Sequence, residues 1–152
     1  LVGVSFALLD LAADYSPDLS GTIVIETGGM KGRRREITRQ ELHMMLKKKL
    51  NLGSVHSEYG MTELLSQAYS KGDGIFQTPP WMKILIRDPH DPLSLLNGTG
   101  RTGGINIIDL ANIHSCSFIA TSDLGMLRPD GGFDVLGRFD ESDIRGCNLL
   151  AI

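Results

Sequence analysis

The apolar residues of this chain follow one pattern before residue 71 and another after it. Residues 2–11 are apolar enough for either a strand or a helix. Residues 22–25 form a continuous, largely β-branched run, which is typical of a strand buried on both faces. A short strand is predicted from residue 55, followed by a helix over residues 62–70 with Thr62 as its N-cap. This alternation favours an α/β unit with a largely parallel sheet.

Another helix is predicted between those strands, directly after Thr38. Thr38 and Glu41 have the spacing of a capping box, in which each side chain bonds to the other residue's backbone. Apolar residues then recur at helical spacing at Leu42, Met45, Leu46 and Leu50. Three lysines, residues 47–49, suit the last turn of a helix, and Asn51 and Gly53 are typical of its end.

From about residue 71 onward, glycines and prolines separate short strand-like runs. The predicted strands cover residues 82–87, 104–110, 117–121 and 133–136, and residues 128–132 have the composition of a hairpin turn. The sequence therefore predicts a mixed α/β fold with two subdomains. Residues 1–72 form the α/β subdomain, and residues 73–152 form a small β-rich, barrel-like one.

Composition narrows the class of protein. The chain has 152 residues, of which 41% are hydrophobic and 22% charged, as in ordinary globular domains. Its net charge of −3 disfavours nucleic-acid binding, despite basic runs at residues 33–35 and 47–49. Two cysteines outside any CxxC pair favour a reducing, cytoplasmic setting. The apolar start is interrupted at Asp10, so no membrane span is expected. Because the chain begins at Leu1, inside an apolar run, we expect it to belong to a longer protein.

The first candidate site is a glycine loop. Gly28 and Gly29 follow a predicted strand, and the missing Cβ atoms let the backbone approach a flat ligand closely. A plain tight turn explains the same residues, and the Walker phosphate-loop pattern is not satisfied.

The second candidate runs from Tyr59 to Glu63. The ring of Tyr59 offers a face for a purine, Gly60 clears room, and the Thr62 hydroxyl suits a phosphate oxygen. Glu63 beside a phosphate makes sense with a magnesium ion between them. A capped helix with an acid in its first turn is an equally good explanation.

Further candidates lie in the second half of the chain. Asp123, at the end of a strand, can accept hydrogen bonds from ribose hydroxyls, although an Asp-initiated turn is common there. Arg138 can contact ribose or phosphate, or form a surface ion pair with a nearby acid. Cys147 can be a thiol nucleophile or simply a buried residue. His56, His114 and Cys116 lack the spacing of metal ligands and are weak evidence for a metal site.

The order of these motifs is more informative than any single one. A glycine loop, then YGMTE, then TSDLG, then GRFD resembles the order of nucleotide-binding motifs in adenylate-forming enzymes, the acyl-CoA synthetase superfamily. The segments ETGGMKGRRREITRQELH, HSEYGMTELLSQAYS, DLANIHSCSFIATSDLG and RGCNLL more specifically resemble acyl-protein synthetases of the LuxE type. The resemblance extends from about residue 25 to residue 150.

The resemblance implies a role for each candidate. Gly28 and Gly29 would line an adenine pocket with Tyr59 and Gly60. Thr62 would contact the α-phosphate of ATP or AMP, and Glu63 would hold Mg²⁺. In the second half, Asp123 would bind the ribose hydroxyls, Arg138 would contact ribose or phosphate, and Cys147 would accept the acyl group.

The implied reaction activates a fatty acid as acyl-AMP and transfers the acyl group through a cysteine thioester to a partner such as a fatty-acid reductase. The superfamily's Ser/Thr/Gly-rich loop with a lysine, which holds the β- and γ-phosphates, is absent from this sequence, as is its mobile C-terminal domain. This favours a second hypothesis, a non-catalytic nucleotide- or acyl-binding module that regulates or scaffolds a partner.

Overall fold

The computed structural model describes residues 1–28, 37–72 and 74–139. The residues group into two compact units. The first contains Leu1–Met61 and Gln67–Phe76, and the second contains Thr62–Ser66 and the chain from Gln77 onward. A five-residue segment of the sequence thus belongs to the second unit although both its neighbours belong to the first.

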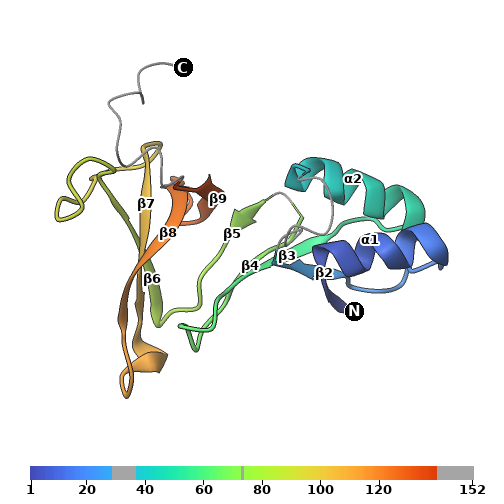
Figure 1. The fold of residues 1–152 in the computed structure, drawn as a ribbon, viewed down its shortest axis with the longest axis horizontal. Helices are drawn as coiled ribbons and strands as arrows, with labels where there is room; N and C mark the ends of the chain where they lie inside the picture. Colours follow the sequence, from blue (N-terminus) through green and yellow to red (C-terminus); the bar gives the residue numbers. More distant parts are fainter. Residues whose placement is uncertain (29–36, 73, 140–152) are drawn as a thin grey trace. The chain divides into compact units, whose positions relative to one another are not determined.

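The first unit has a mixed sheet with two helices (Figure 1). Its elements are β1 (Val2–Val4), α1 (Ser5–Asp14), β2 (Ile25–Thr27), α2 (Arg39–Leu50), β3 (His56–Tyr59), β4 (Ala68–Ser70) and β5 (Ile75–Phe76). The sheet order is β1-β2-β3-β4; the first three strands run parallel, and β4 is antiparallel to β3. The predicted α/β character and largely parallel sheet are confirmed.

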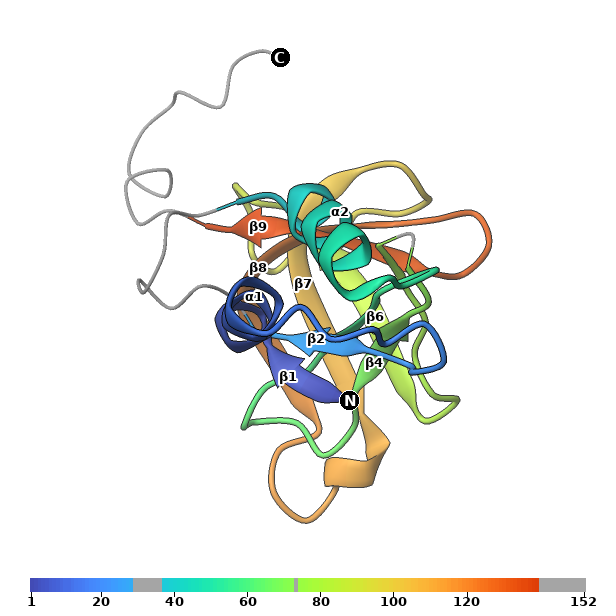
Figure 2. The same ribbon diagram turned by 90° about the vertical axis from the view of Figure 1, so that its right-hand side faces the viewer.

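The core of this unit lies between the helices and the strands. Helices α1 and α2 lie side by side (Figure 2), because each buries an apolar stripe against the other. The buried cluster comprises Leu8, Leu9, Ala12, Val24, Leu42, Leu46, Leu50, Leu52 and Val55. Val24 and Val55 directly precede β2 and β3, so the chain enters both strands from this core.

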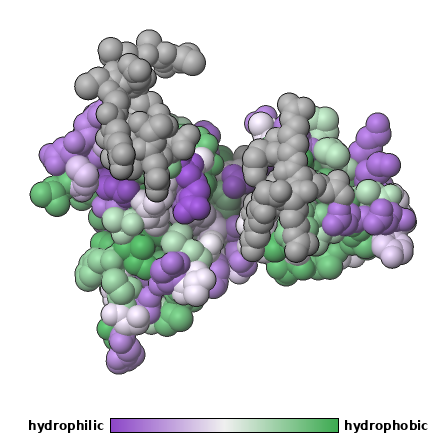
Figure 3. Space-filling model, in the orientation of Figure 1, coloured by the Kyte–Doolittle hydropathy of each residue, from purple (hydrophilic) through white to green (hydrophobic). Residues whose placement is uncertain are grey.

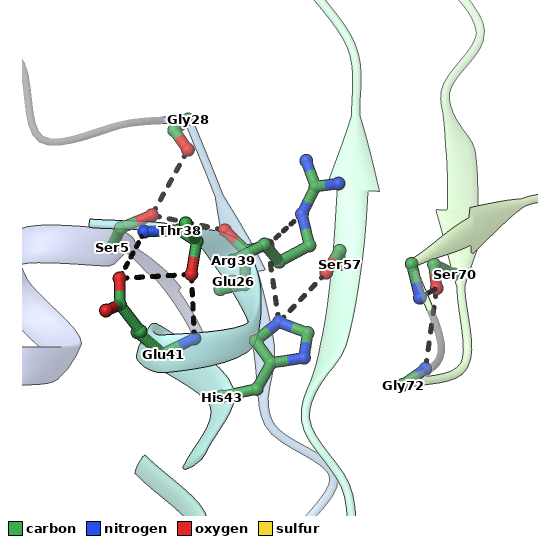
Figure 4. Close-up of polar contacts among 11 residues, drawn as sticks. Ser5, Glu26, Gly28, Thr38, Arg39, Glu41, His43, Ser57, Ser70 and Gly72 are labelled. Atoms are coloured by element: carbon green, nitrogen blue, oxygen red, sulfur yellow. Dashed lines mark hydrogen bonds and ion pairs between the residues drawn. The ribbon is translucent and has the colours of Figure 1, made fainter. Parts of the chain in front are cut away.

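Helix α2 confirms the prediction made from its capping box. The Thr38 hydroxyl accepts a hydrogen bond from the Glu41 N–H at 3.2 Å, and the Thr38 N–H donates to the Glu41 carboxylate at 2.8 Å (Figure 4). At the other end, Asn51 adopts the left-handed conformation with φ 54°, as a helix C-cap often does. Local sequence alone therefore sets both ends of this helix.

The strand predicted over residues 22–25 is shifted in the structure. Ile23 is 65% exposed, so the run is not buried on both faces. The Thr22 N–H donates to the Leu19 carbonyl at 2.8 Å, which places Thr22 at the end of a turn and not in a strand. Parallel pairing starts where β1 starts, with Val2 opposite Ile25, and this long-range register sets the beginning of β2.

The helix predicted over residues 62–70 is wrong. Thr62 and Glu63 form a turn, and the chain then runs extended into β4. Exposure alternates residue by residue from Glu63 to Ser70, which is the period of an extended chain and not of a helix. Antiparallel pairing with β3 gives the backbone of β4 its hydrogen bonds, so the local helical preference is overridden.

The second unit is an antiparallel sheet. Its strands are β6 (Met82–Arg87), β7 (Thr102–Asp109), β8 (Phe118–Leu127) and β9 (Phe133–Arg138), with a 3₁₀ turn at Leu110–Asn112. They pair in the order β9-β8-β7-β6. The β-rich prediction is confirmed, including the hairpin turn, in which the Arg128 N–H donates to the Gly132 carbonyl at 2.8 Å. Among the described residues the sheet is open and does not close into a barrel.

The surface is mixed in character. Figure 3 shows hydrophobic residues beside hydrophilic ones on the face in view. Among the residues that the structure describes, 15 large hydrophobic ones are exposed, including Trp81 and Phe118. Within the described ranges, neither α-helix has the length and apolar character needed to cross a membrane.

Candidate functional site

Two of the predicted adenine-pocket residues lie at one edge of the first sheet. Thr27 and Glu58 are paired across β2 and β3; Gly28 directly follows β2, and Tyr59 is the last residue of β3. Since β2 and β3 run parallel, both residues are at the carboxyl edge, where open α/β sheets bind ligands. Gly28 has φ 69°, a conformation that side chains other than glycine rarely adopt.

Tyr59 is buried and packs against Phe76, whose ring also contacts Arg39. Its side chain is only 8% exposed and packs edge-on against Phe76, with ring centroids 5.9 Å apart. The guanidinium of Arg39 lies 4.9 Å from the centroid of the Phe76 ring. Gly60 follows, where an added Cβ would lie 3.0 Å from Cγ of Gln67. The tyrosine is therefore fixed before any ligand binds.

A buried polar cluster lies beneath this edge (Figure 4). Glu26 is only 3% exposed. Its Oε1 accepts a hydrogen bond from Arg39 Nε at 3.3 Å and lies 3.5 Å from His43 Nε2. Burial opposes ionisation of Glu26, but hydrogen bonds from His43 and Ser57 and the positive charge of Arg39 outweigh it, so its pKa lies below the ordinary value. The carboxylate thus ties α2 to β2 and β3.

The cluster contains a serine, a histidine and an acid, but they do not form a catalytic triad. The Ser57 hydroxyl lies 3.2 Å from His43 Nε2, and the same nitrogen faces Glu26. A triad needs the serine and the acid at opposite ring nitrogens. A second serine, Ser5, has its hydroxyl 3.1 Å from both the Glu26 carboxylate and the Gly28 carbonyl. The cluster therefore supports the Gly28 turn.

Thr62 and Glu63 belong to the second unit, and both side chains are exposed. The backbone just after them is bonded to Asp109, at the end of β7. Its Oδ2 accepts the N–H groups of Leu65 at 3.0 Å and Ser66 at 2.9 Å. Nδ2 of Asn112 donates to the Glu63 carbonyl at 2.8 Å.

The exposed Glu63 side chain fits a magnesium ion in its chemistry. It offers carboxylate oxygens, and Mg²⁺ is commonly held by one or two carboxylates together with nucleotide phosphates. In the described ranges, no group of three or more His, Cys, Asp or Glu side chains is arranged to hold a metal ion by itself. A metal here would rely on phosphate oxygens for its remaining ligands.

Asp123 and Arg138 lie directly opposite each other on β8 and β9. Arg138 Nε is 3.3 Å from Asp123 Oδ1, and the arginine side chain is 77% exposed. The register of β8 and β9 shifts between Leu124, which pairs with Gly137, and Gly125, which pairs with Val135. Leu136 is therefore an extra residue on β9, a β-bulge. The bulge lies beside Gly137, whose φ of 150° favours glycine. The ribose candidate and the arginine candidate are thus brought together.

Arg87 joins β7 and β8 beside this pair, and sequence reasoning did not single it out. Its Nη2 donates to the Thr121 carbonyl at 2.6 Å, and its Nη1 donates to the Asn106 side chain at 2.7 Å. The Thr121 hydroxyl in turn accepts the Asp123 N–H at 3.1 Å. Partial burial lowers the pKa of Arg87. An arginine within a strand of apolar residues is the sequence signal that would have indicated this role.

Two predicted residues lie outside the described residues: Gly29, in the glycine loop, and the acyl-acceptor candidate Cys147. The basic run at residues 33–35 lies outside them as well. Cys116 is described and carries a free, exposed thiol. The structure therefore groups Gly28 with Tyr59 in one unit, and Thr62, Glu63, Asp123 and Arg138 in the other.

Comparison with known proteins identifies similar structures. No family model matches the sequence. No curated protein matches it either. Among solved structures, ATP-bound MatB from Rhodopseudomonas palustris matches 91% of this chain with a TM-score of 0.67 at 20% sequence identity. The o-succinylbenzoate CoA synthetase MenE from Bacillus subtilis matches 92% with a TM-score of 0.66 at 20% identity. The amide bond synthetase McbA from Marinactinospora thermotolerans matches 90% with a TM-score of 0.65 at 19% identity.

The chain has the fold of a segment of these synthetases. It spans 30–31% of the length of each of the three. This fold agrees with the one expected from the resemblance to adenylate-forming enzymes.

Proposed function

We propose that this chain is the C-terminal part of an ATP-dependent acyl-protein synthetase. One observation carries the proposal: four motifs in the order used by adenylate-forming enzymes lie on a fold shared with synthetases of that superfamily. The ATP bound to one of those structures supports ATP as the nucleotide. The more specific LuxE type rests on the sequence resemblance alone.

The proposed reaction has two steps. A carboxylate oxygen of a fatty acid attacks the α-phosphorus of ATP, and pyrophosphate leaves, which gives acyl-AMP. The thiolate of Cys147 then attacks the acyl carbonyl carbon, and AMP leaves, which gives a thioester. The acyl group passes from there to a partner such as a fatty-acid reductase.

The chain's own residues divide the work of nucleotide binding. Gly28, Gly29, Tyr59 and Gly60 receive the adenine. The exposed Thr62 hydroxyl donates to an α-phosphate oxygen, while Asp123 accepts hydrogen bonds from ribose hydroxyls. Arg138, paired with Asp123, donates to ribose or phosphate. Glu63 would hold Mg²⁺, which would supply positive charge beside the phosphates.

The test is carboxylate-dependent exchange of pyrophosphate into ATP, measured on the full-length protein with long-chain fatty acids. We expect exchange that requires the fatty acid and Mg²⁺. Absence of exchange with every acid tested, together with absence of AMP binding, would refute the proposal. The acceptor role of Cys147 is tested with labelled fatty acid: Cys147→Ser should retain exchange but lose the covalent label, whereas Cys116→Ser should retain both.

The alternative is a nucleotide- or acyl-binding module without catalytic activity. Absence of a lysine-containing phosphate loop from the full-length protein would favour it. This alternative predicts AMP or acyl-AMP binding without pyrophosphate exchange in the full-length protein, so the same two measurements distinguish the two functions.

A further inference from the structure

The segment that carries Thr62 and Glu63 is held by a residue far away in sequence. Asp109 lies 43–44 residues after the backbone groups that it binds, Leu65 and Ser66. Its Oδ1 also accepts the Ser66 hydroxyl at 2.7 Å and the Ala111 N–H at 3.1 Å. Four donors thus converge on one carboxylate, and three of them come from residues 65 and 66.

Asp109 is buried, so its carboxylate depends on the hydrogen bonds from residues 65 and 66. The residue is 0% exposed, and a buried carboxylate is costly unless hydrogen bonds compensate for lost water. Burial raises its pKa, but the hydrogen bonds from Ser66, Leu65 and Ala111 outweigh burial, so the pKa lies below the ordinary value.

Asn112 holds the other end of the same segment. Its Nδ2 donates to the Glu63 carbonyl at 2.8 Å and to the Cys116 carbonyl at 3.0 Å. The two protons of the amide are therefore both used, one on the carbonyl of the residue proposed to hold Mg²⁺. Asn112 is itself buried, and it ends the 3₁₀ turn that Asp109 caps.

Trp81 completes the support. Its Nε1 donates to the Ser66 hydroxyl at 2.9 Å, and that hydroxyl donates to Asp109. The Trp81 carbonyl also accepts the Leu110 N–H at 3.0 Å. The chain at residues 63–66 is thereby tied to the end of β7 and to the residue just before β6.

We propose that Asp109 and Asn112 are positioning residues, which hold the Thr62–Glu63 turn in the geometry that nucleotide phosphate and Mg²⁺ require. The inference rests on the proposed function, because it assigns these residues to the phosphate end of the same site. The helix predicted for this sequence does not form, so the bonds from Asp109 and Asn112 tie the turn to the rest of the second unit.

The matched variants are Asp109→Asn and Asp134→Asn in the full-length protein. Both aspartates are buried in the same unit, but Asp134 pairs with Arg128 at 2.6 Å in the β8–β9 hairpin. Asp109→Asn should lower kcat for pyrophosphate exchange about 10- to 100-fold and raise the Mg²⁺ concentration for half-maximal activity, with the KM for fatty acid unchanged. Asp134→Asn should leave all three values unchanged even if it lowers the melting temperature.

Amide hydrogen exchange provides a readout that needs no activity. The N–H groups of Leu65 and Ser66 should lose protection in Asp109→Asn but keep it in Asp134→Asn. If Asp109→Asn does not fold, Asn112→Ala serves as the second variant, with the same loss of kcat and higher Mg²⁺ requirement expected.

The outcomes separate the two claims. A wild-type protein without exchange and without AMP binding refutes the proposed function and this inference together. An active wild type refutes only the inference if Asp109→Asn keeps its kcat and Mg²⁺ dependence, or if Asp134→Asn loses them equally. If Asn112→Ala folds and keeps the wild-type kcat and Mg²⁺ dependence, that result also refutes the inference.

Discussion

Asp123 and Arg138 face each other across β8 and β9, with Arg138 Nε 3.3 Å from Asp123 Oδ1. The residues come from two different sequence motifs, and the register of one hairpin brings them together. The ion pair leaves most of the arginine side chain in solvent. An exposed pair of this kind contributes only about 0–1 kcal/mol to stability. Removal of the arginine charge should therefore change stability little, so that an effect on nucleotide binding can be measured separately.

The first prediction concerns Arg138. Arg138→Gln should weaken AMP binding about tenfold, because a charged hydrogen bond worth about 1.5–3 kcal/mol is lost, while the melting temperature stays nearly the same. Titration calorimetry and thermal unfolding measure the two effects. The control is Arg128→Gln, which breaks a different ion pair in the same hairpin and should leave AMP affinity unchanged. Equal AMP affinity in Arg138→Gln and wild type would contradict the assignment.

The second prediction concerns the close approach of β8 to its neighbours. A Cβ added at Gly125 would lie 2.6 Å from the Asp134 carbonyl oxygen and 2.6 Å from Ile105 Cδ1. Gly125→Ala should therefore destabilise the protein by about 1–3 kcal/mol, as measured by denaturant unfolding. At Gly53 an added Cβ meets nothing within 4 Å, so Gly53→Ala is the control and should not destabilise. A Gly125→Ala protein of wild-type stability would show that the strands separate easily.

The third prediction tests the core of the first unit. Leu46 is 0% exposed between the helices, whereas Met44, on the same helix, is 66% exposed. Leu46→Ala should cost about 2–5 kcal/mol of unfolding free energy through lost burial and a residual cavity. Met44→Ala should change it by less than about 0.5 kcal/mol. Similar losses in the two variants would mean that α2 does not bury the face described here.

The fourth prediction is a pH dependence from Glu26. Because the pKa of Glu26 is lower in the folded state, its ionisation stabilises the fold above the pKa of an unfolded glutamate, about 4.3. That stabilisation is lost as the pH falls through the lower, folded-state pKa. Glu26→Gln should therefore destabilise the protein at pH 7 more than at pH 3, in denaturant unfolding at both values. A difference that is the same at both pH values would contradict the pKa direction.

Local sequence determined the elements whose signals lie within a few residues of one another. Thr38 and Glu41 start α2, and Asn51 ends it, because capping bonds are made between near neighbours. Residues 82–87 were predicted as a strand and form β6, since their apolar run lies between turn-forming residues. The glycine-rich turn at residues 128–132 joins β8 to β9 for the same reason.

Other features depend on partners far away in the chain, and these only the tertiary structure decided. Thr62 as an N-cap predicts a helix over residues 62–70, yet the Asp109 carboxylate accepts the N–H groups of Leu65 and Ser66, and β3 pairs with the strand that follows. A buried carboxylate needs several donors, and those donors need not be near in sequence. Asp109 therefore carried no local signal of its role.

In the candidate site, the sequence indicated the residue types, and the tertiary structure determined which of them lie together. The sequence indicated Asp123 and Arg138 separately, as chemistry for ribose and phosphate, because the residue types suit those groups. It did not determine that they face each other. That follows from the register of β8 and β9 and from the bulge at Leu136, since a shift of one residue along a strand moves a side chain to the opposite face of the sheet.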